Sequence, residues 1–265
     1  MDPGTFFDVQ IALATGCAST AWVFSVLAVH AWQLALFPVQ AQHDVWDDDP
    51  RALIGSSYAP TGRVEVEEGG YRLSGRWCFS SGSTHCGWFF LGGLIHGEGG
   101  PQMRTFLVPR SDVVLETCWD TVGLEGTGSN DVVVDGAWVP EHRTHRLGDG
   151  FSGRSPGLAV HDAPLFRLPF GQVFVRSVST TILGVLEGAL DAYLGVAREK
   201  IAASNRGKIS LDPVSQRVCA QAIATLDAEK LVLHRSFEEM MAQVRAGEPI
   251  PILRRVQFRY ESARA

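Results

Sequence analysis

A single short stretch concentrates the side chains that could do chemistry. WCFSSGSTHCGWFF, residues 77–90, holds three serines, a threonine, a histidine and two cysteines around two tryptophans. Small side chains at the end of a strand let a flat ring approach the backbone, and hydroxyl groups can bond the heteroatoms of such a ring. Ser80 and Ser81 are therefore candidate ligand contacts, although a β-bulge with a tight turn explains the same composition without a ligand.

A histidine within an apolar run is the second candidate. His30 lies in WVFSVLAVHAW, where an ionisable ring must either be satisfied by a neighbour or serve a pocket. The stretch IGSSYAPTG, residues 54–62, is predicted to be a loop of small hydroxyl residues before the first strand, and it suits ligand binding and a turn equally. From the residues alone, a satisfied core histidine is the more common case, so both interpretations stay open.

Other familiar chemical motifs are missing from the sequence. His142 and His145 form an HxxH pair, but no second ligand cluster accompanies them, so a solvated loop is favoured over a metal site. The five cysteines include no CxxC pair, which argues against a disulfide framework or a zinc site and favours a reducing cytoplasm. No GxGxxG motif follows a strand, and neither a P-loop nor a GxSxG elbow is present.

Composition indicates the class of protein that must position these residues. With 265 residues, of which 45% are hydrophobic and 20% charged, the chain can bury a substantial core. The net charge of −6 includes no basic block, which argues against nucleic acid as a partner. The apolar run over residues 6–37 is interrupted by polar residues, and no Lys or Arg precedes Arg51, so it predicts two buried helices and no membrane span.

The predicted elements follow the order helices, strands, helices, which is an α+β fold. Helical spacing covers residues 6–48, and short β-type runs between turn residues cover 60–140, which predicts an antiparallel sandwich or small barrel. Asp212 followed by Pro213 predicts a helix start, and Gly247 a helix end. The predicted domains are 1–50 (N-terminal helices), 51–145 (β domain), 146–170 (a connection that lines a site or links domains) and 171–265 (a helical bundle).

Three stretches together carry a resemblance to a known family. GRWCFSSG, GLEGTGSNDVVVDGAWVPEHRT and RLPFGQVFVRSVSTTILGVLEGALDAY resemble the acyl-CoA dehydrogenase fold and, within it, the flavin-dependent aromatic hydroxylase branch. That branch includes the oxygenase components of two-component p-hydroxyphenylacetate hydroxylase and of 3-hydroxy-9,10-seco-steroid monooxygenase. The resemblance covers nearly the whole chain, and the order of helices and strands agrees with it independently.

The resemblance implies roles for individual residues. His30 is similar to the histidine that meets the phenol and helps to deprotonate it, and Ser56 to a hydroxyl that contacts the same oxygen. Ser81 corresponds to the serine near the flavin N5 and C4a edge, with Ser80 as an adjacent candidate. Arg206 lies where the superfamily often places a basic residue near the flavin phosphates of a partner subunit. No metal ligand is expected.

The implied reaction needs a separate reductase that supplies reduced FMN or FAD, with dioxygen as co-substrate. Oxygen forms a C4a-hydroperoxyflavin, whose distal oxygen is transferred to the ring carbon ortho to the hydroxyl of a phenol, such as a steroid-derived or polyketide phenol. A histidine with a pKa near neutral is suited to accept the phenol proton. Two alternatives stay open: an acyl-CoA dehydrogenase with tightly bound FAD, and an inactive truncated oligomeric remnant.

The resemblance also bears on the extent of the chain and on its surroundings. Family members continue beyond both ends of this sequence, so the resemblance implies a chain truncated at both ends, an incomplete C-terminal bundle and a homotetramer. Ser129 and Asn130 are expected to turn their loop rather than to touch a ligand. Five aromatic residues either line the pocket or belong to the core: Trp22, Phe24, Trp32, Phe166 and Phe170.

Overall fold

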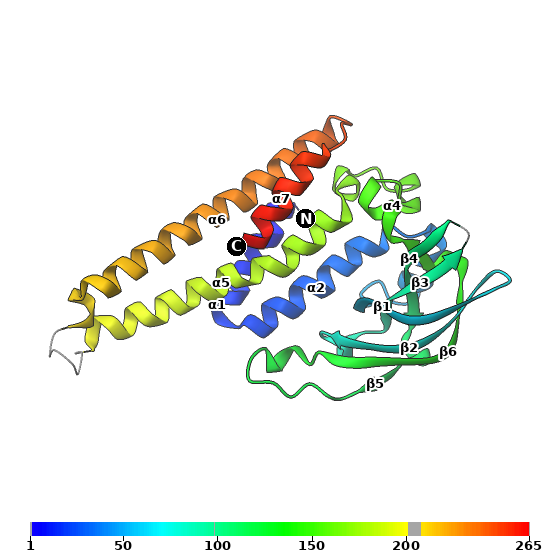
Figure 1. The fold of residues 1–265 in the computed structure, drawn as a ribbon, viewed down its shortest axis with the longest axis horizontal. Coiled ribbons are helices and arrows are strands. Elements are labelled where there is room, and N and C mark those ends of the chain that lie inside the picture. Colours follow the sequence, from blue (N-terminus) through cyan, green and yellow to red (C-terminus); the bar gives the residue numbers. More distant parts are fainter. Residues whose placement is uncertain (1, 98, 201–207, 265) are drawn as a thin grey trace. The chain divides into compact units, whose positions relative to one another are not determined.

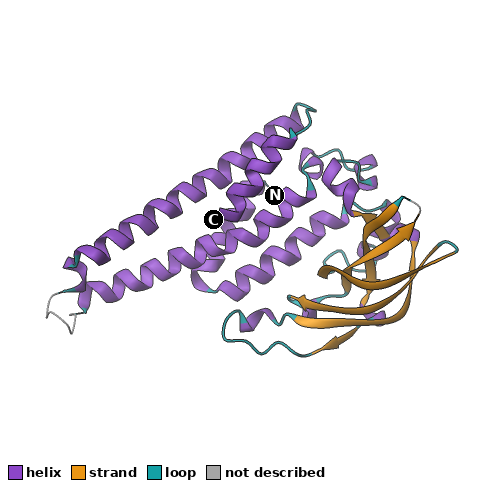
Figure 2. Ribbon diagram, in the orientation of Figure 1, coloured by secondary structure: helices purple, strands orange, loops and turns teal. Residues whose placement is uncertain are grey.

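The computed structural model describes residues 2–97, 99–200 and 208–264. The chain folds as two compact units, one formed by Met1–Trp22 with Val175–Ala265 and the other by Val23–Phe174. Helices precede and follow the strands along the chain, as the sequence predicts, and Figure 2 distinguishes the two kinds of element by colour. The helical unit and the β unit are described separately below.

The helical unit contains α1 (Pro3–Gly16), α6 (Pro213–Arg245), α7 (Ile252–Arg264) and most of α5 (Phe170–Glu199) (Figure 1). The predicted start of α6 is confirmed, because the Asp212 carboxylate accepts a hydrogen bond from Ser215 N and Pro213 occupies the first turn. The predicted end is confirmed too, since Gly247 follows the helix with φ of 74°.

Close packing joins α1 to α5 inside this unit. A Cβ atom on Gly184 would lie 2.2 Å from the carbonyl oxygen of Ile11, so only glycine allows the two helices to approach so closely. Buried Gln10 donates from Nε2 to Ser177 O at 2.5 Å and to Thr181 Oγ1 at 2.8 Å. The sequence of α1 is apolar because its residues form part of a helical core.

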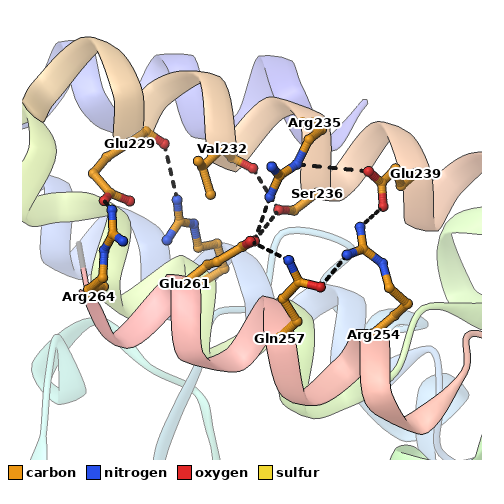
Figure 3. A network of polar contacts seen from close by, with 10 residues as sticks. Glu229, Val232, Arg235, Ser236, Glu239, Arg254, Gln257, Glu261 and Arg264 are labelled. Carbon is orange, nitrogen blue, oxygen red and sulfur yellow. Dashed lines mark hydrogen bonds and ion pairs between the residues drawn. The ribbon is translucent and has the colours of Figure 1, made fainter. Parts of the chain in front are cut away.

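Helix α7 is attached to α6 by a set of ion pairs (Figure 3). Arg235 lies 2.7 Å from Glu261, and Arg264 lies 3.0 Å from the buried carboxylate of Glu229. The Arg235–Glu261 pair is partly exposed, and such pairs contribute about 0–1 kcal/mol each. Phe258 of α7 is 4% exposed, so burial of its ring also stabilises this helix in the unit.

The β unit begins with the later part of α2 (Ala18–Leu34) and with α3 (Val39–Trp46). After the sheet it contains α4 (Leu147–Ser152), two short 3-10 helices and the first residues of α5, up to Phe174. Its strands are β1 (Ile54–Glu67), β2 (Gly70–Ser80), β3 (Trp88–Gly97), β4 (Gly100–Pro109), β5 (Val114–Glu116), β6 (Asn130–Pro140) and β7 (Thr144–Arg146). They form one seven-stranded sheet in the order β5-β6-β2-β1-β3-β4-β7. The expected α+β fold is confirmed.

Strand β1 differs from the prediction in two ways. Residues 54–62 form the first half of this strand and not a loop, because they pair with β3. That pairing is parallel, whereas every other recorded pair in the described sheet is antiparallel as predicted. After a register shift between Ser57 and Gly62, β1 turns to β2 as partner.

The change of partner brings the two halves of the sheet around a common core. Trp77 of β2 is fully buried and donates from Nε1 to Gly92 O of β3 at 2.8 Å. Gly62 is required at this point because a Cβ atom there would lie 2.4 Å from the Trp77 ring. A second cluster packs α2 and α3 on the sheet through Phe37, Phe90 and other apolar residues.

The N-terminal helices do not have the length and hydropathy of a membrane span. Within the described ranges, α5 alone reaches the length and mean hydropathy of one. A single helix of this kind is weak support for a span, because core helices share its length and composition.

Candidate active site

His30 lies on the face of α2 that meets β1, and it is 1% exposed. Its Nδ1 lies 2.6 Å from the carbonyl oxygen of Ile54. Because a carbonyl can only accept, Nδ1 carries the hydrogen and Nε2 carries the lone pair in the neutral ring. That Nε2 is buried and has no hydrogen-bond partner among the described residues.

Burial decides the charge of this ring. Loss of solvent lowers the pKa of His30 to about 4, and the hydrogen bond to Ile54 opposes the shift only in part. The expectation of a near-neutral pKa is therefore wrong, since the depth of His30 in the fold was not visible in the sequence. The ring is neutral at physiological pH and can accept a proton at Nε2.

Three polar side chains stand beside His30 on the same two elements. Gln33 follows three residues later on α2, so it shares a helix face with His30, and it is 1% exposed. Tyr58 donates its hydroxyl hydrogen to Gln33 Oε1 and is hydrogen-bonded to Ser56. Burial raises the pKa of Tyr58, so its hydroxyl stays protonated and can donate this hydrogen bond. The structure thus brings Ser56 into this group.

Aromatic rings surround these polar groups. The His30 ring makes edge contacts with Phe90 at 5.8 Å and with Tyr58 at 6.1 Å between centroids. Trp32 stacks on Phe170 at 6.3 Å, and Phe170 in turn contacts Tyr58 at 6.0 Å. Two of the five aromatic residues singled out from the sequence, Trp32 and Phe170, are therefore close to the predicted site.

The end of β2 is irregular where the serines occur. The pairing of β2 with β6 shifts register between Trp77 and Ser80, and Phe79 adopts a φ of 64°. A left-handed conformation is rare for such a residue, and here it accompanies the register shift. The expected bulge is present, and it turns consecutive serines to different environments.

Ser80 and Ser81 differ in their contacts. Ser80 is fully buried, and its Oγ has no hydrogen-bond partner in the parts of the chain that the structure describes. It lies against β1, since a Cβ atom on Gly55 would be 3.2 Å from that oxygen. Ser81 is half-buried, and its Oγ lies 2.8 Å from Ser129 Oγ. An unsatisfied buried hydroxyl beside a half-exposed one fits the polar edge of a flavin ring, so these residues could hold that cofactor.

Sequence reasoning missed several members of this group. Ser129 also contacts Thr127, whose Oγ1 is 2.7 Å away, so it does more than turn its loop. Gln33 and Tyr58 were not singled out, although each follows a candidate at the spacing of its element, three residues in the helix and two in the strand. That spacing is a usable signal once the elements are known.

The remaining candidates lie elsewhere. His145 is 3% exposed in β7, and its Nε2 lies 3.0 Å from Ser155 Oγ, so the predicted solvated loop is wrong for this residue. The Nε2 of His142 lies 2.7 Å from the Asp44 carboxylate. Over residues 2–97, 99–200 and 208–264, no group of three His, Cys, Asp or Glu side chains could hold a metal ion. Arg206 lies outside the described residues.

Comparisons with known proteins show which family this chain is similar to. The family model described as "Acyl-CoA dehydrogenase, C-terminal domain" matches residues 177–265. Over 100% of its length the chain is 38% identical to the oxygenase subunit HsaA of a flavin-dependent monooxygenase from Rhodococcus jostii (strain RHA1), covering 70% of that protein. Over 89% of its length it is 37% identical to the oxygenase component of an FADH2-dependent resorcinol hydroxylase from Rhizobium sp. (strain MTP-10005), covering 59%.

Solved structures give the same answer for the fold. The crystal structure of 3-HSA hydroxylase from Rhodococcus sp. RHA1 matches with a TM-score of 0.93 and 37% sequence identity, over 100% of this chain and 68% of that one. Identity at this level over most of a relative's length is more specific than a shared fold. The chain belongs to the family of flavin-dependent monooxygenase oxygenase components, which is built on the acyl-CoA dehydrogenase fold.

Proposed function

We propose that this chain is the oxygenase component of a two-component flavin-dependent monooxygenase that hydroxylates a phenol ortho to its hydroxyl group. The observation that carries the proposal is His30, a buried neutral ring whose Nε2 lone pair is unused by the described residues. A buried acceptor without a donor is costly, and a phenol hydroxyl would satisfy it. The surrounding aromatic rings suit the flat ring of the same molecule.

His30 acts as the proton acceptor in this proposal. Its bond to Ile54 O fixes the ring orientation and leaves Nε2 to face the phenol. Moving the phenol proton toward Nε2 increases electron density at the ortho carbon, which makes that carbon the better nucleophile. The developing phenolate charge raises the pKa of His30, because an anion beside the ring favours its charged form. The pKa of His30 is thus low in the free protein and rises when a phenol is bound.

Ser56 is proposed as the second contact to the phenol oxygen, supported by its position two residues from Ile54 on the same face of β1. Its bond to Tyr58, which is held by Gln33, limits the directions its hydroxyl can take. Ser80 and Ser81 are proposed to contact the flavin edge. Reduced FMN or FAD, when bound, supplies the two electrons that activate dioxygen, and a separate reductase provides it.

The proposal also includes the assembly and the location of the protein. Assembly as a homotetramer is expected by analogy with the family, and light scattering of the purified chain tests it. A cytoplasmic location is supported by five cysteines that are all unpaired. The acyl-CoA dehydrogenase alternative is weaker because the relatives reported above are hydroxylases and monooxygenases.

The test replaces His30 with asparagine, and the exposed His43 of α3 provides a matched His43→Asn control. Resorcinol binding is measured by calorimetry, and ortho-dihydroxylated product is measured with reduced flavin supplied by an added reductase. We expect His30→Asn to weaken resorcinol binding about tenfold and to abolish most product, while His43→Asn matches the wild type. Equal product from His30→Asn would contradict the proposal. A wild-type chain that binds neither flavin nor phenol would support the inactive alternative instead.

A further inference from the structure

Three hydroxyl groups beside the end of β2 form a chain that terminates on a backbone carbonyl. Ser81 Oγ lies 2.8 Å from Ser129 Oγ, which lies 2.7 Å from Thr127 Oγ1, which lies 2.8 Å from Leu124 O. Ser129 and Thr127 are 4% and 2% exposed. The backbone holds the same segments together, since Gly82 N donates to Thr127 O at 2.8 Å. We call this series of three hydrogen bonds, from Ser81 through Ser129 and Thr127 to Leu124 O, the hydroxyl relay.

The carbonyl end gives the hydroxyl relay a direction. Leu124 O can only accept, so the contact with Thr127 Oγ1 requires the hydrogen of Thr127. Thr127 must then accept from Ser129, and Ser129 must accept from Ser81, because each hydroxyl has one hydrogen. The reverse direction would leave Thr127 Oγ1 and Leu124 O 2.8 Å apart with no hydrogen between them. One direction alone satisfies all three contacts.

The direction determines how Ser81 meets a ligand. Its hydrogen is committed to Ser129, so toward any other group its oxygen acts as an acceptor. Reduced flavin carries an N–H at N5, whereas oxidised flavin carries a lone pair there. From this we infer that Thr127 and Ser129 are positioning residues that make the site bind reduced flavin in preference to oxidised flavin. The inference rests on the proposed function and assigns redox-state selectivity to residues beyond the flavin contacts themselves.

Selectivity of this kind suits a protein whose cofactor comes from a separate reductase. The site must take up flavin in the reduced form and release it after oxidation, so a difference in affinity between the two forms helps the exchange. By linkage, tighter binding of the reduced form raises the reduction potential of the bound flavin. Each tenfold change in the affinity ratio corresponds to about 30 mV for a two-electron couple.

The test measures the dissociation constants of the full chain for oxidised and for anaerobically reduced FMN and FAD. Ser129→Ala and Thr127→Val both free the Ser81 hydrogen, so we expect each to reduce the preference for the reduced form about tenfold and to lower the bound potential by about 30 mV. Thr127→Ser keeps the hydroxyl and should keep the ratio. Ser83→Ala is the matched control, since Ser83 Oγ lies in the same segment but donates to Gly128 O at 3.5 Å, outside the relay.

The outcomes separate this inference from the proposed function. Wild-type preference for reduced flavin together with an unchanged ratio in Ser129→Ala would overturn the relay and leave the function standing. A wild-type chain that binds no flavin would refute the function itself. Ser129→Ala removes one oxygen atom only, so it also covers the case in which Thr127→Val does not fold, which circular dichroism would reveal.

Discussion

Replacing His30 with asparagine should change how the stability of the protein depends on pH. The side-chain amide of asparagine can still donate to Ile54 O, whereas the group that titrates is removed. In the wild type the pKa of His30 is about 4 when folded, against an ordinary value of 6.5 when unfolded. Below pH 6.5 the unfolded chain therefore takes up a proton that the folded chain refuses, and the free energy of unfolding falls as pH falls toward 4.

The size of the effect follows from the same shift. Above about pH 7 the ring is neutral in both states and contributes no pH dependence. Between pH 7.5 and 4.5 the wild type should lose about 2 to 3 kcal/mol more stability than His30→Asn. His145, whose pKa burial also lowers to about 4, contributes a loss of the same sign to both proteins, so the difference between them isolates His30.

Urea-induced unfolding followed by tryptophan fluorescence at the two pH values measures this difference. His43→Asn, at an exposed position, should behave like the wild type. If His30→Asn and the wild type lose equal free energy between pH 7.5 and 4.5, His30 is not held neutral by burial. The Nε2 atom would then not be a buried neutral acceptor, and the proposed role of His30 would lose its support.

Two further predictions concern the packing that positions the site and the helical unit. Gly184→Ala should cost about 1–3 kcal/mol, because its Cβ would lie 2.2 Å from Ile11 O, whereas Gly195→Ala, with open space in the same helix, should stabilise the protein by up to about 1 kcal/mol; equal effects in urea unfolding would disprove the close approach. Trp77→Phe should cost about 1–3 kcal/mol in the same assay, because it leaves the carbonyl of Gly92 without its buried donor, and a neutral effect would show that water or a new partner replaces it.

Local patterns predicted much of the fold, and long-range pairing explains what they missed. The ends of α6 were predictable because Asp212, Pro213 and Gly247 act within a few residues of themselves. The small polar composition of residues 54–62 is typical of turns and therefore predicted a loop. Only the parallel pairing with β3 makes these residues a strand. No local sequence pattern indicates a pairing strand that lies more than thirty residues away, as Trp88 does from Ile54.

The candidate site shows the same division. His30 was singled out as an ionisable ring in an apolar run, and the resemblance gave roles to His30 and Ser56. The structure places both residues beside Tyr58, and their roles stay predictions. The pKa of His30 could not be predicted, because it depends on how deeply α2 packs on β1. The contact of Ser129 with Ser81 was missed for a related reason, since a loop residue gains its partner only when β2 and β6 are paired.

The change of partner along β1 bears on how substrates can diversify in such proteins. One end of this strand holds the carbonyl that anchors His30, and the backbone at Gly55 lies against Ser80 at the end of β2. The separation between His30 and Ser80, which would be the proton acceptor and the flavin contact under the proposed function, is therefore set by the main chain of β1. Under the proposed function, substitution of the aromatic rings around His30 would therefore change which phenols fit while this spacing is kept.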